Sequence, residues 1–104
     1  MNPERTYFKN GQIRTECWRT EDGVWHRIDG PAHRWWYKNG QLHLEDWYIN
    51  GIHHRIDGPT IQSWLENGQL DHEAWYINGV YYHTESEFLI AVDLYKANEI
   101  AELF

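Results

Sequence analysis

The sequence contains one cysteine, Cys17, three prolines and no long apolar run. A single cysteine excludes a disulfide within the chain and fits a reducing compartment. Without a run of about 20 apolar residues, no transmembrane helix is expected. The first residues, 1–5, lack the pattern of a signal peptide. We therefore expect a cytoplasmic protein that does not enter a membrane.

Basic residues are also few: nine Lys and Arg stand against 16 Asp and Glu, for a formal net charge of −7. A protein of this charge is not expected to bind duplex nucleic acid, which is recognised by basic patches. It is also not expected to be attracted to an anionic membrane. The charge suits a basic protein partner, and it equally suits solubility alone.

A repeat with a period of about 28 residues dominates what the sequence does contain. Three segments recur in the same order at this one spacing: His-Arg-Ile-Asp-Gly-Pro at 26–31 and 54–59, Asn-Gly-Gln-Leu at 39–42 and 67–70, and Trp-Tyr-Ile-Asn-Gly at 47–51 and 75–79. An earlier, degraded copy carries one inserted residue, because Trp18 precedes Trp47 by one position more than Gly23 precedes Gly51. The chain thus holds nearly three copies and begins in mid-unit, and about three copies are needed for a stable stack.

Two kinds of turn signal separate strand-like runs in each copy. Asn-Gly predicts a hairpin with a type I′ turn, which needs positive φ at both central residues. The dipeptide occurs at 10–11, 39–40, 50–51, 67–68 and 78–79, and Asp22 with Gly23 serves the same way. In Asp-Gly-Pro, the Asp can bond its own backbone, the Gly supplies an unusual φ, and the Pro withholds an N–H from the next strand.

The runs between the turns are rich in Trp, Tyr, Ile and Leu, which favour strands. We expect strands at 5–9, 12–19, 24–27, 32–38, 41–49, 52–55, 60–66, 69–77 and 80–83. Alternation in the run 69–77 places Glu73 and Trp75 on one face and Ala74 and Tyr76 on the other. Neither face is cleanly apolar, so the predicted fold is mainly β: antiparallel hairpin repeats forming a thin, elongated, twisted sheet with both faces wet.

The last segment, 84–104, has helical spacing, within a single domain of 1–104. Thr84 followed three residues later by Glu87 forms a capping box. Apolar residues recur at helical intervals after it: Phe88, Leu89, Ala91, Val92, Tyr95, Ile100, Leu103 and Phe104. We expect this helix to cap the open end of the repeat array, which spans 5–83.

Residues that repeat are expected to hold the fold. They are Trp18, Trp47, Trp75 and the residues of the two Asp-Gly-Pro turns, Asp29, Gly30, Pro31, Asp57, Gly58 and Pro59. Arg27 and Arg55 lie beside these turns and can reach carboxylates such as Glu45 and Glu73, which predicts a ladder of Arg–carboxylate pairs. An anion-binding groove at the two arginines is the alternative, since a guanidinium also matches phosphate.

Catalytic residues, metal ligands and cofactors are not expected. The seven histidines include one adjacent pair, His53 with His54, and neighbours in a strand point to opposite faces. Cys17 falls in a predicted strand without an evident activating partner, and Ser63 and Ser86 lie outside any elbow motif. A hydrolase or phosphodiesterase using His and Asp stays open as an alternative.

Positions at which the copies differ are candidates for binding, although ordinary drift produces such differences too. The differing sets are His33 and Trp35 against Ile61 and Ser63, and Trp25 against His53 and Tyr81. Trp, Tyr and Arg dominate binding hot spots. The candidate binding residues are therefore Trp25, His33, Trp35 and His53, together with Arg27 and Arg55.

The succession of Trp-Tyr-Ile-Asn-Gly, His-Arg-Ile-Asp-Gly-Pro, an aromatic strand and Asn-Gly-Gln-Leu resembles repeats of bacteriophage and giant-virus proteins. Those repeats are similar to MORN repeats, short β-hairpin modules with Gly and aromatic landmarks. The resemblance covers about 10–83 and leaves out the helix. The unit here is longer than a MORN repeat, and Asp-Gly-Pro is foreign to that consensus. The resemblance implies protein or lipid contacts and scaffolding, not catalysis.

The leading hypothesis is a small, acidic, non-enzymatic protein that binds a host protein in the cytoplasm of an infected cell. A phage inhibitor of a host defence protein would act in this way, by analogy alone. The alternative is a binder of a small ligand or nucleotide signal, held by Arg27, Arg55 and stacked Trp. Exposed strand edges and aromatic faces also favour a homodimer.

Overall fold

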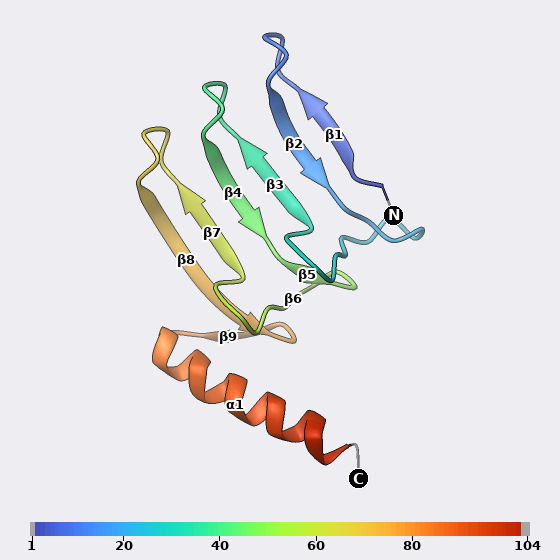
Figure 1. Ribbon diagram of the computed structural model, residues 1–104, viewed down its shortest axis with the longest axis vertical. Helices are drawn as coiled ribbons and strands as arrows, with labels where there is room; N and C mark the ends of the chain where they lie inside the picture. Colours follow the sequence, from blue (N-terminus) through green and yellow to red (C-terminus); the bar gives the residue numbers. More distant parts are fainter. Residues whose placement is uncertain (1, 103–104) are drawn as a thin grey trace.

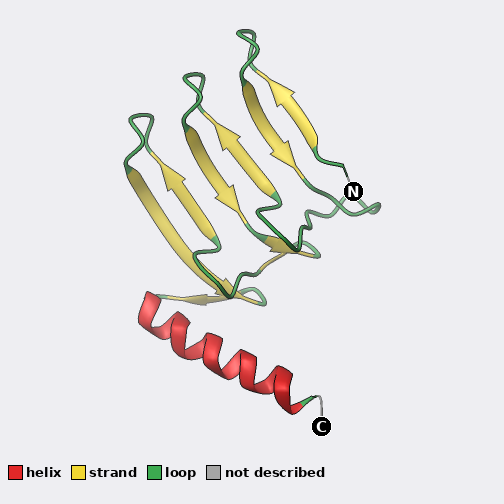
Figure 2. Cartoon of the chain, viewed as in Figure 1, coloured by secondary structure: helices red, strands yellow, loops and turns green. Residues whose placement is uncertain are grey.

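Three long hairpins lie side by side and dominate the structure (Figure 1). The computed structural model describes residues 2–102. Its elements are β1 (Glu4–Tyr7), β2 (Ile13–Cys17), β3 (His33–Trp36), β4 (Leu42–Asp46), β5 (Tyr48–Ile49), β6 (Ile52–His53), β7 (Ile61–Trp64), β8 (Leu70–Ile77), β9 (Val80–Tyr82) and α1 (Glu85–Ala101). Within residues 2–102, seven strands form one antiparallel sheet in the order β1-β2-β3-β4-β7-β8-β9, and β5 pairs with β6. The predicted mainly β fold with one C-terminal helix is confirmed (Figure 2).

The sheet is thin, as its mixed faces predicted. The molecule measures 54 × 33 × 16 Å, so it is flat as well as elongated. The buried hydrophobic residues are Ala32, Ala74, Ile77, Phe88 and Val92. The last three cluster where α1 packs against β8 and β9, so the small apolar core lies at the helix end of the array.

The tips of the long hairpins differ from the predicted type I′ turns. Only the glycine of each Asn-Gly pair has a positive φ there: Gly11 (87°), Gly40 (88°) and Gly68 (89°). Each tip is a longer loop beside a bulge in the strand pairing; in the first, Phe8 N donates to Gln12 O at 2.8 Å. A type I turn followed by a left-handed glycine makes such a three-residue loop. Asn-Gly suits both loop lengths, so the dipeptide alone does not decide the turn type.

The short hairpins do have the predicted type I′ turns. Asn50 and Gly51 have φ angles of 49° and 77°, and Asn78 and Gly79 have 49° and 80°. The corresponding turn of the first copy is longer by the inserted residue, and it closes with a hydrogen bond of 2.8 Å from Thr20 N to Val24 O.

Asparagines at the long tips join one copy to the next. Asn10 Nδ2 donates to Lys38 O at 3.2 Å, and Asn39 Nδ2 donates to Glu66 O at 3.0 Å. At the opposite ends of the hairpins, histidine side chains make equivalent joints. His26 Nδ1 accepts from Asn50 N at 2.9 Å, and His54 Nδ1 accepts from Asn78 N at 3.0 Å. Successive copies are therefore held by the same bonds in the same register.

Two predicted strands are wrong in part. Over 24–27, a single bridge between Arg19 and Trp25 replaces the expected strand. The backbone of this segment bonds in two directions instead, because His26 N donates to Trp18 O and Arg27 N donates to Tyr48 O. The predicted strand 41–49 is interrupted at Trp47, and Trp47 N donates a hydrogen bond to Thr60 O at 2.9 Å.

The glycines of the Asp-Gly-Pro turns have a different role from the one predicted. Neither Gly30 nor Gly58 has a φ in the left-handed region. A Cβ built on Gly30 would lie 2.7 Å from Arg27 Cζ, and one on Gly58 would lie 2.9 Å from Arg55 Cζ. At both places the guanidinium lies where a Cβ would stand, so any larger residue would require the arginine to shift.

The helix α1 begins as the capping box predicted. Thr84 Oγ1 accepts from Glu87 N at 3.1 Å. Glu87 Oε2 in turn accepts from His83 N at 3.2 Å, one residue earlier than in the usual reciprocal box. Both bonds satisfy backbone donors at the point where the chain leaves β9.

Only part of the predicted apolar stripe of α1 is buried. Phe88 and Val92 are buried, and Ala91 and Tyr95 pack against the same cluster. Leu89 and Ile100 of the stripe are exposed, because α1 buries only the side that faces β8 and β9. The last two predicted positions, Leu103 and Phe104, lie outside the described residues.

Candidate binding face

Ten aromatic rings form an unbroken series on one face of the sheet, here named the aromatic face. In order of contact they are Tyr37, His43, Trp35, His33, Trp25, Tyr48, His53, Tyr76, Tyr81 and His83. Neighbouring ring centroids are 4.2 to 6.1 Å apart, the range of stacked and edge-to-face contacts. All three copies contribute rings, so the series crosses the joints between them.

Alternation along the strands decides which side chains join this face. On β3, His33 and Trp35 point to the aromatic face, and Arg34 between them points to the other. On β8, Tyr76 joins the aromatic face while Glu73 points away. This division on β8 is the one predicted from the sequence.

Trp25, His33 and Tyr48 form the centre of the aromatic face. Trp25 stacks on His33 with ring centroids 4.5 Å apart and meets Tyr48 edge-on at 5.2 Å. Beneath them the carboxylate of Asp46, which is buried, lies 3.3 Å from His33 Nδ1. Burial, with the Asp46 charge as a smaller cause, raises the pKa of the Tyr48 hydroxyl. The centre is therefore an ordered cluster with one buried negative charge below it.

His53 lies between two tyrosines in the middle of the series. Its ring centroid is 4.2 Å from that of Tyr48 and 4.9 Å from that of Tyr76. Burial lowers the pKa of His53, and the carboxylate of Asp46 offsets part of this effect. Its Nε2 is buried without a hydrogen-bond partner in the described chain. His53 therefore acts mainly as a neutral aromatic ring.

Two large rings of the series are accessible, the third in order and the ninth. Trp35 is 40% exposed and Tyr81 is 45% exposed, although both rings are large and apolar. Rings of this kind give much contact area for little loss of side-chain freedom, and they are enriched at binding hot spots. The aromatic face thus offers two exposed anchors on a rigid base.

The opposite face carries a transverse row of polar side chains, here named the charge row. Strand register aligns its members across six strands: Arg5, Glu16, Arg34, Glu45, Gln62 and Glu73. Arg5 Nε lies 3.0 Å from Glu16, and Arg34 Nε lies 2.8 Å from Glu45. Arg34 also reaches Glu16 at 3.7 Å. An Arg–carboxylate ladder exists, but Arg5 and Arg34 build it, and the predicted pairs of Arg27 and Arg55 with Glu45 and Glu73 do not form among the described residues.

Arg27 and Arg55 lie on the charge-row face, away from the aromatic face. Their guanidinium carbons lie over tryptophan rings, 4.4 Å from the centroid of Trp18 and 4.0 Å from that of Trp47. Arg55 also bonds Asp57 at 2.7 Å, and its Nη1 donates to the carbonyl of the turn proline at 3.0 Å. Arg27 makes the equivalent bonds at 3.0 and 3.4 Å. These contacts give both arginines the structural role that their repetition predicted.

The third copy lacks the corresponding arginine. The residue one repeat period after Arg55 is His83, and its ring belongs to the aromatic face. Trp75, the equivalent of Trp47, packs instead against the apolar cluster that contains Phe88 of α1. The helix therefore replaces the arginine of the earlier copies as a cover for this tryptophan.

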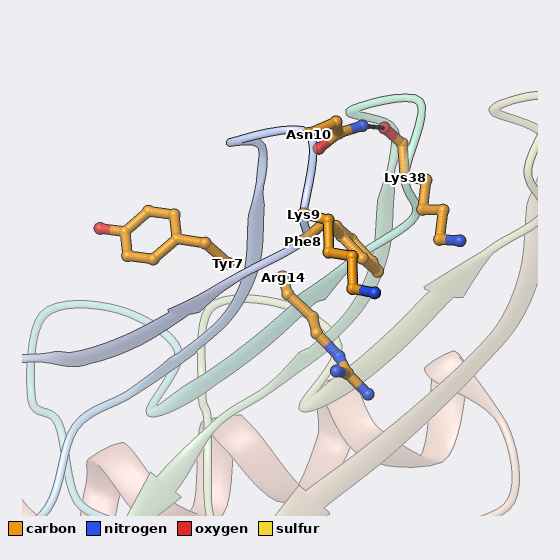
Figure 3. A pocket seen from close by; sticks show the side chains of 6 residues that line it. All are labelled: Tyr7, Phe8, Lys9, Asn10, Arg14 and Lys38. Atoms are coloured by element: carbon orange, nitrogen blue, oxygen red, sulfur yellow. Dashed lines mark hydrogen bonds between the residues drawn. The ribbon is translucent and has the colours of Figure 1, made fainter.

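A hollow lies at the hairpin tips of the first two copies (Figure 3). It measures about 520 Å³ and is lined by Tyr7, Phe8, Lys9, Asn10, Arg14 and Lys38. Arg14 lies over the ring of Phe8, with Cζ 5.7 Å from the centroid. In Figure 3 the side chain of Tyr7 points away from the other five. Three cations beside one aromatic ring make this hollow a basic spot on an acidic protein.

Sequence reasoning found part of the aromatic face. It named Trp25, His33, Trp35 and His53, which the structure brings into one series. It missed Tyr48 and Tyr76 because they repeat, and repetition was interpreted as structural. Other members not named as candidates are Tyr37, His43, Tyr81 and His83. Tyr81 was among the positions at which the copies differ, and hairpin pairing across the turn at 78–79 places it opposite Tyr76.

Comparison with known protein families, curated proteins and solved structures gave no match. Among residues 2–102, no three side chains of His, Cys, Asp or Glu gather as metal ligands. In the same part of the chain, α1 is neither long nor apolar enough to cross a membrane.

Proposed function

We propose that this chain is a small acidic binding protein that engages a basic partner protein through the aromatic face. The observation that carries the proposal is the unbroken series of ten rings, which exposes Trp35 and Tyr81 on a chain of net charge −7. Arginine and lysine side chains of a partner would stack on these rings. The net charge would speed the encounter with a basic surface.

The histidine side chains favour binding over catalysis, because their ring nitrogens form hydrogen bonds that hold the fold together. His26 and His54 each use Nδ1 as an acceptor for a backbone N–H at a joint between copies. His33 is held by Asp46 beneath Trp25. These histidines are parts of the framework, which suits a protein that presents a fixed surface. The hydrolase alternative would have to use the His33–Asp46 pair.

The resemblance to viral repeats supports a narrower form of the same proposal. In that form the partner is a host protein in the cytoplasm, and the chain inhibits a host defence protein. An inhibitor needs only to cover a functional surface of its target. A rigid aromatic face of this length would do so without catalysing a reaction.

The test compares variants on and off the aromatic face. Trp35→Ala and Tyr81→Ala remove the two exposed anchors, and Tyr7→Ala removes a tyrosine that is 59% exposed and lies outside the series. Proteins retained from a host lysate would be identified, purified and titrated against all four chains. We expect a basic partner whose Kd rises at least about tenfold with either anchor variant and stays unchanged with Tyr7→Ala. Equal affinity for all four chains would refute the role of this face.

A second candidate function rests on the basic hollow at the hairpin tips. Lys9, Lys38 and Arg14 beside Phe8 could hold the phosphate and base of a nucleotide. This site replaces Arg27 and Arg55 as the candidate anion site, because those guanidinium groups are occupied by turn atoms. A nucleotide panel should raise the melting temperature of the wild type but not of Lys38→Gln. A flat profile for the wild type would exclude this candidate.

A further inference from the structure

The two outer strand edges of the sheet are complementary, and we infer that they join one copy of this chain to the next. At one end of the sheet, β1 pairs with β2 alone among residues 2–102, so its outer edge is open there. At the other end, β9 pairs with positions 75–77 of β8, so positions 70–74 of β8 pair with β7 alone within the described chain. Both edges are therefore available in the folded protein.

The repeat shows that these two edges match in register. β1 is the equivalent of β3, because Arg5 precedes Arg34 by the same offset that separates Trp18 from Trp47. β8 is the equivalent of β4, because Glu73 follows Glu45 by one repeat period. Inside the chain, β2 pairs with β3 and β4 pairs with β7 in one register. β8 of one copy against β1 of another repeats that pairing.

The charges at the two edges agree with this register. Glu16 and Arg34 are direct partners across β2 and β3, with oxygen and nitrogen 3.7 Å apart. The same register would place Glu73 of one copy opposite Arg5 of the next. Within its own chain Glu73 is bonded by the neutral Gln62, whereas Glu45 has Arg34. The charge row thus ends in a cation at one edge and an anion at the other.

The backbone groups at these positions also point outward. Thr60 N donates to Ala74 O, so the carbonyl of Ala74 faces β7. Because successive residues of a strand direct their backbone groups to opposite sides, those of Glu73 face the free edge. Leu70, at the start of that edge, is 51% exposed, whereas its equivalent Leu42 in β4 is half-buried. An incoming β1 would satisfy these donors and acceptors.

The asparagine joint at the hairpin tips provides a further match. Asn10 and Asn39 bond the carbonyls of Lys38 and Glu66 in the next hairpin. In the last hairpin, Asn67 Nδ2 reaches Gln69 Oε1 at 3.4 Å. The first-copy equivalent of Lys38 is Lys9, which precedes Asn10 as Lys38 precedes Asn39. In the assembly, Asn67 of one copy would donate to the carbonyl of Lys9 in the next.

Such an assembly is head-to-tail, because different edges meet. A contact of this kind leaves one edge of each type free and adds copies until the rotation closes a ring or a filament grows. Here each addition repeats the step between hairpins within the chain, so the sheet would extend. This inference is independent of the proposed binding function, which uses the aromatic face.

The experiment is a charge complementation measured by sedimentation velocity over a wide range of protein concentration. Glu73→Arg alone puts like charges at the contact, and so does Arg5→Glu alone. Each is expected to weaken self-association about tenfold. An equimolar mixture of the two chains restores opposite charges at every contact, and its association should return to the wild-type level. Circular dichroism confirms that each variant is folded, because Arg5→Glu also removes the Arg5–Glu16 pair.

A second pair of variants separates the strand edges from the exposed apolar side of α1. Glu73→Pro removes the outward N–H and should abolish association. Leu94→Glu changes an exposed helix residue and should leave association unchanged. A wild type that stays monomeric at every concentration would overturn the inference. The inference would also fail if the mixture of Glu73→Arg and Arg5→Glu associated no more strongly than either variant alone. It would fail likewise if association were lost with Leu94→Glu and kept with Glu73→Pro.

Discussion

Arg55 stacks its guanidinium on Trp47, with Cζ 4.0 Å from the ring centroid, and Gly58 lies directly against the same group. The guanidinium is held from three sides, because Asp57 and the carbonyl of Pro59 also bond it. A side chain usually yields to a neighbouring methyl group, but one fixed in this way cannot move without breaking these contacts. The Asp-Gly-Pro turn at 57–59 thus holds the side chain of Arg55 in one position.

Gly58→Ala is expected to destabilise the fold by about 1–2 kcal/mol, the cost of overpacking a well-filled site. Its Cβ would lie 2.9 Å from Arg55 Cζ. Urea denaturation of the single variant, of Arg55→Ala and of the double variant measures the coupling. In the Arg55→Ala background the glycine substitution should cost much less. A cost that stays the same in both backgrounds would show that the glycine acts through its backbone alone.

Glu16→Gln is expected to lower the free energy of unfolding by about 2 kcal/mol. Glu16 is buried and lies within 4 Å of three arginines, at 3.0, 3.7 and 3.9 Å. Removing one partner of a buried pair costs more than this, but Arg5 is half exposed, and solvent screens its charge. Glu21→Gln, at an exposed turn position, is the matched control and should change the stability little. Equal effects of the two substitutions would contradict the role of the charge row.

Stability is expected to fall as the pH decreases from about 7.5 towards 5. Burial lowers the pKa values of His53 and His54 below 6.5, the value of a free histidine, with nearby carboxylates offsetting part of the effect. The unfolded chain therefore binds more protons than the folded chain once the pH drops through 6.5. The loss is complete only below the folded pKa values. Thermal melts across this pH range measure the slope.

His53→Phe is expected to reduce that slope. The variant keeps a ring between Tyr48 and Tyr76 and removes the imidazole nitrogens. One of these, Nε2, has no hydrogen-bond partner in the described chain. Its melting temperature should exceed that of the wild type at the acid end of the range by more than at the neutral end. A melting curve that shifts equally at both ends would show that protonation of His53 does not limit stability.

Thr84→Ala is expected to cost about 1 kcal/mol, the usual value of a helix N-cap. Its hydroxyl accepts from Glu87 N, and the cap stands where β9 passes into α1. Helical signal in circular dichroism should decrease together with thermal stability, because Phe88 and Val92 of the first two turns form much of the core. Thr84→Ser, which keeps the acceptor, should behave as the wild type.

The repeat let the sequence predict most of the architecture, for local reasons. Hairpins at Asn-Gly, the capping box at Thr84 and the division of β8 into two faces follow from bonds within a few residues. The loop lengths at the long tips did not follow, because a bulge in the neighbouring strand decides them. The role of Gly30 did not follow either, because it depends on where Arg27 packs in three dimensions.

The candidate site was predicted only where the copies differ. Trp25 and His53 were found because their equivalents are unlike one another. Tyr48 was passed over because it recurs as Tyr76. A repeated side chain can serve a surface as well as a fold when the repeat itself builds the surface. Ring contacts between copies, such as Tyr48 with His53, depend on the packing of the whole array and leave no local signal.

The thinness of the sheet has a consequence for how this protein can change over evolutionary time. With so little shared core, each hairpin owes its stability to the hairpins beside it, through bonds that recur at every joint. Duplication of one whole repeat unit would leave every existing joint intact. The length of the protein can therefore change in steps of one hairpin unit. Each added unit would lengthen the aromatic face by one more set of rings.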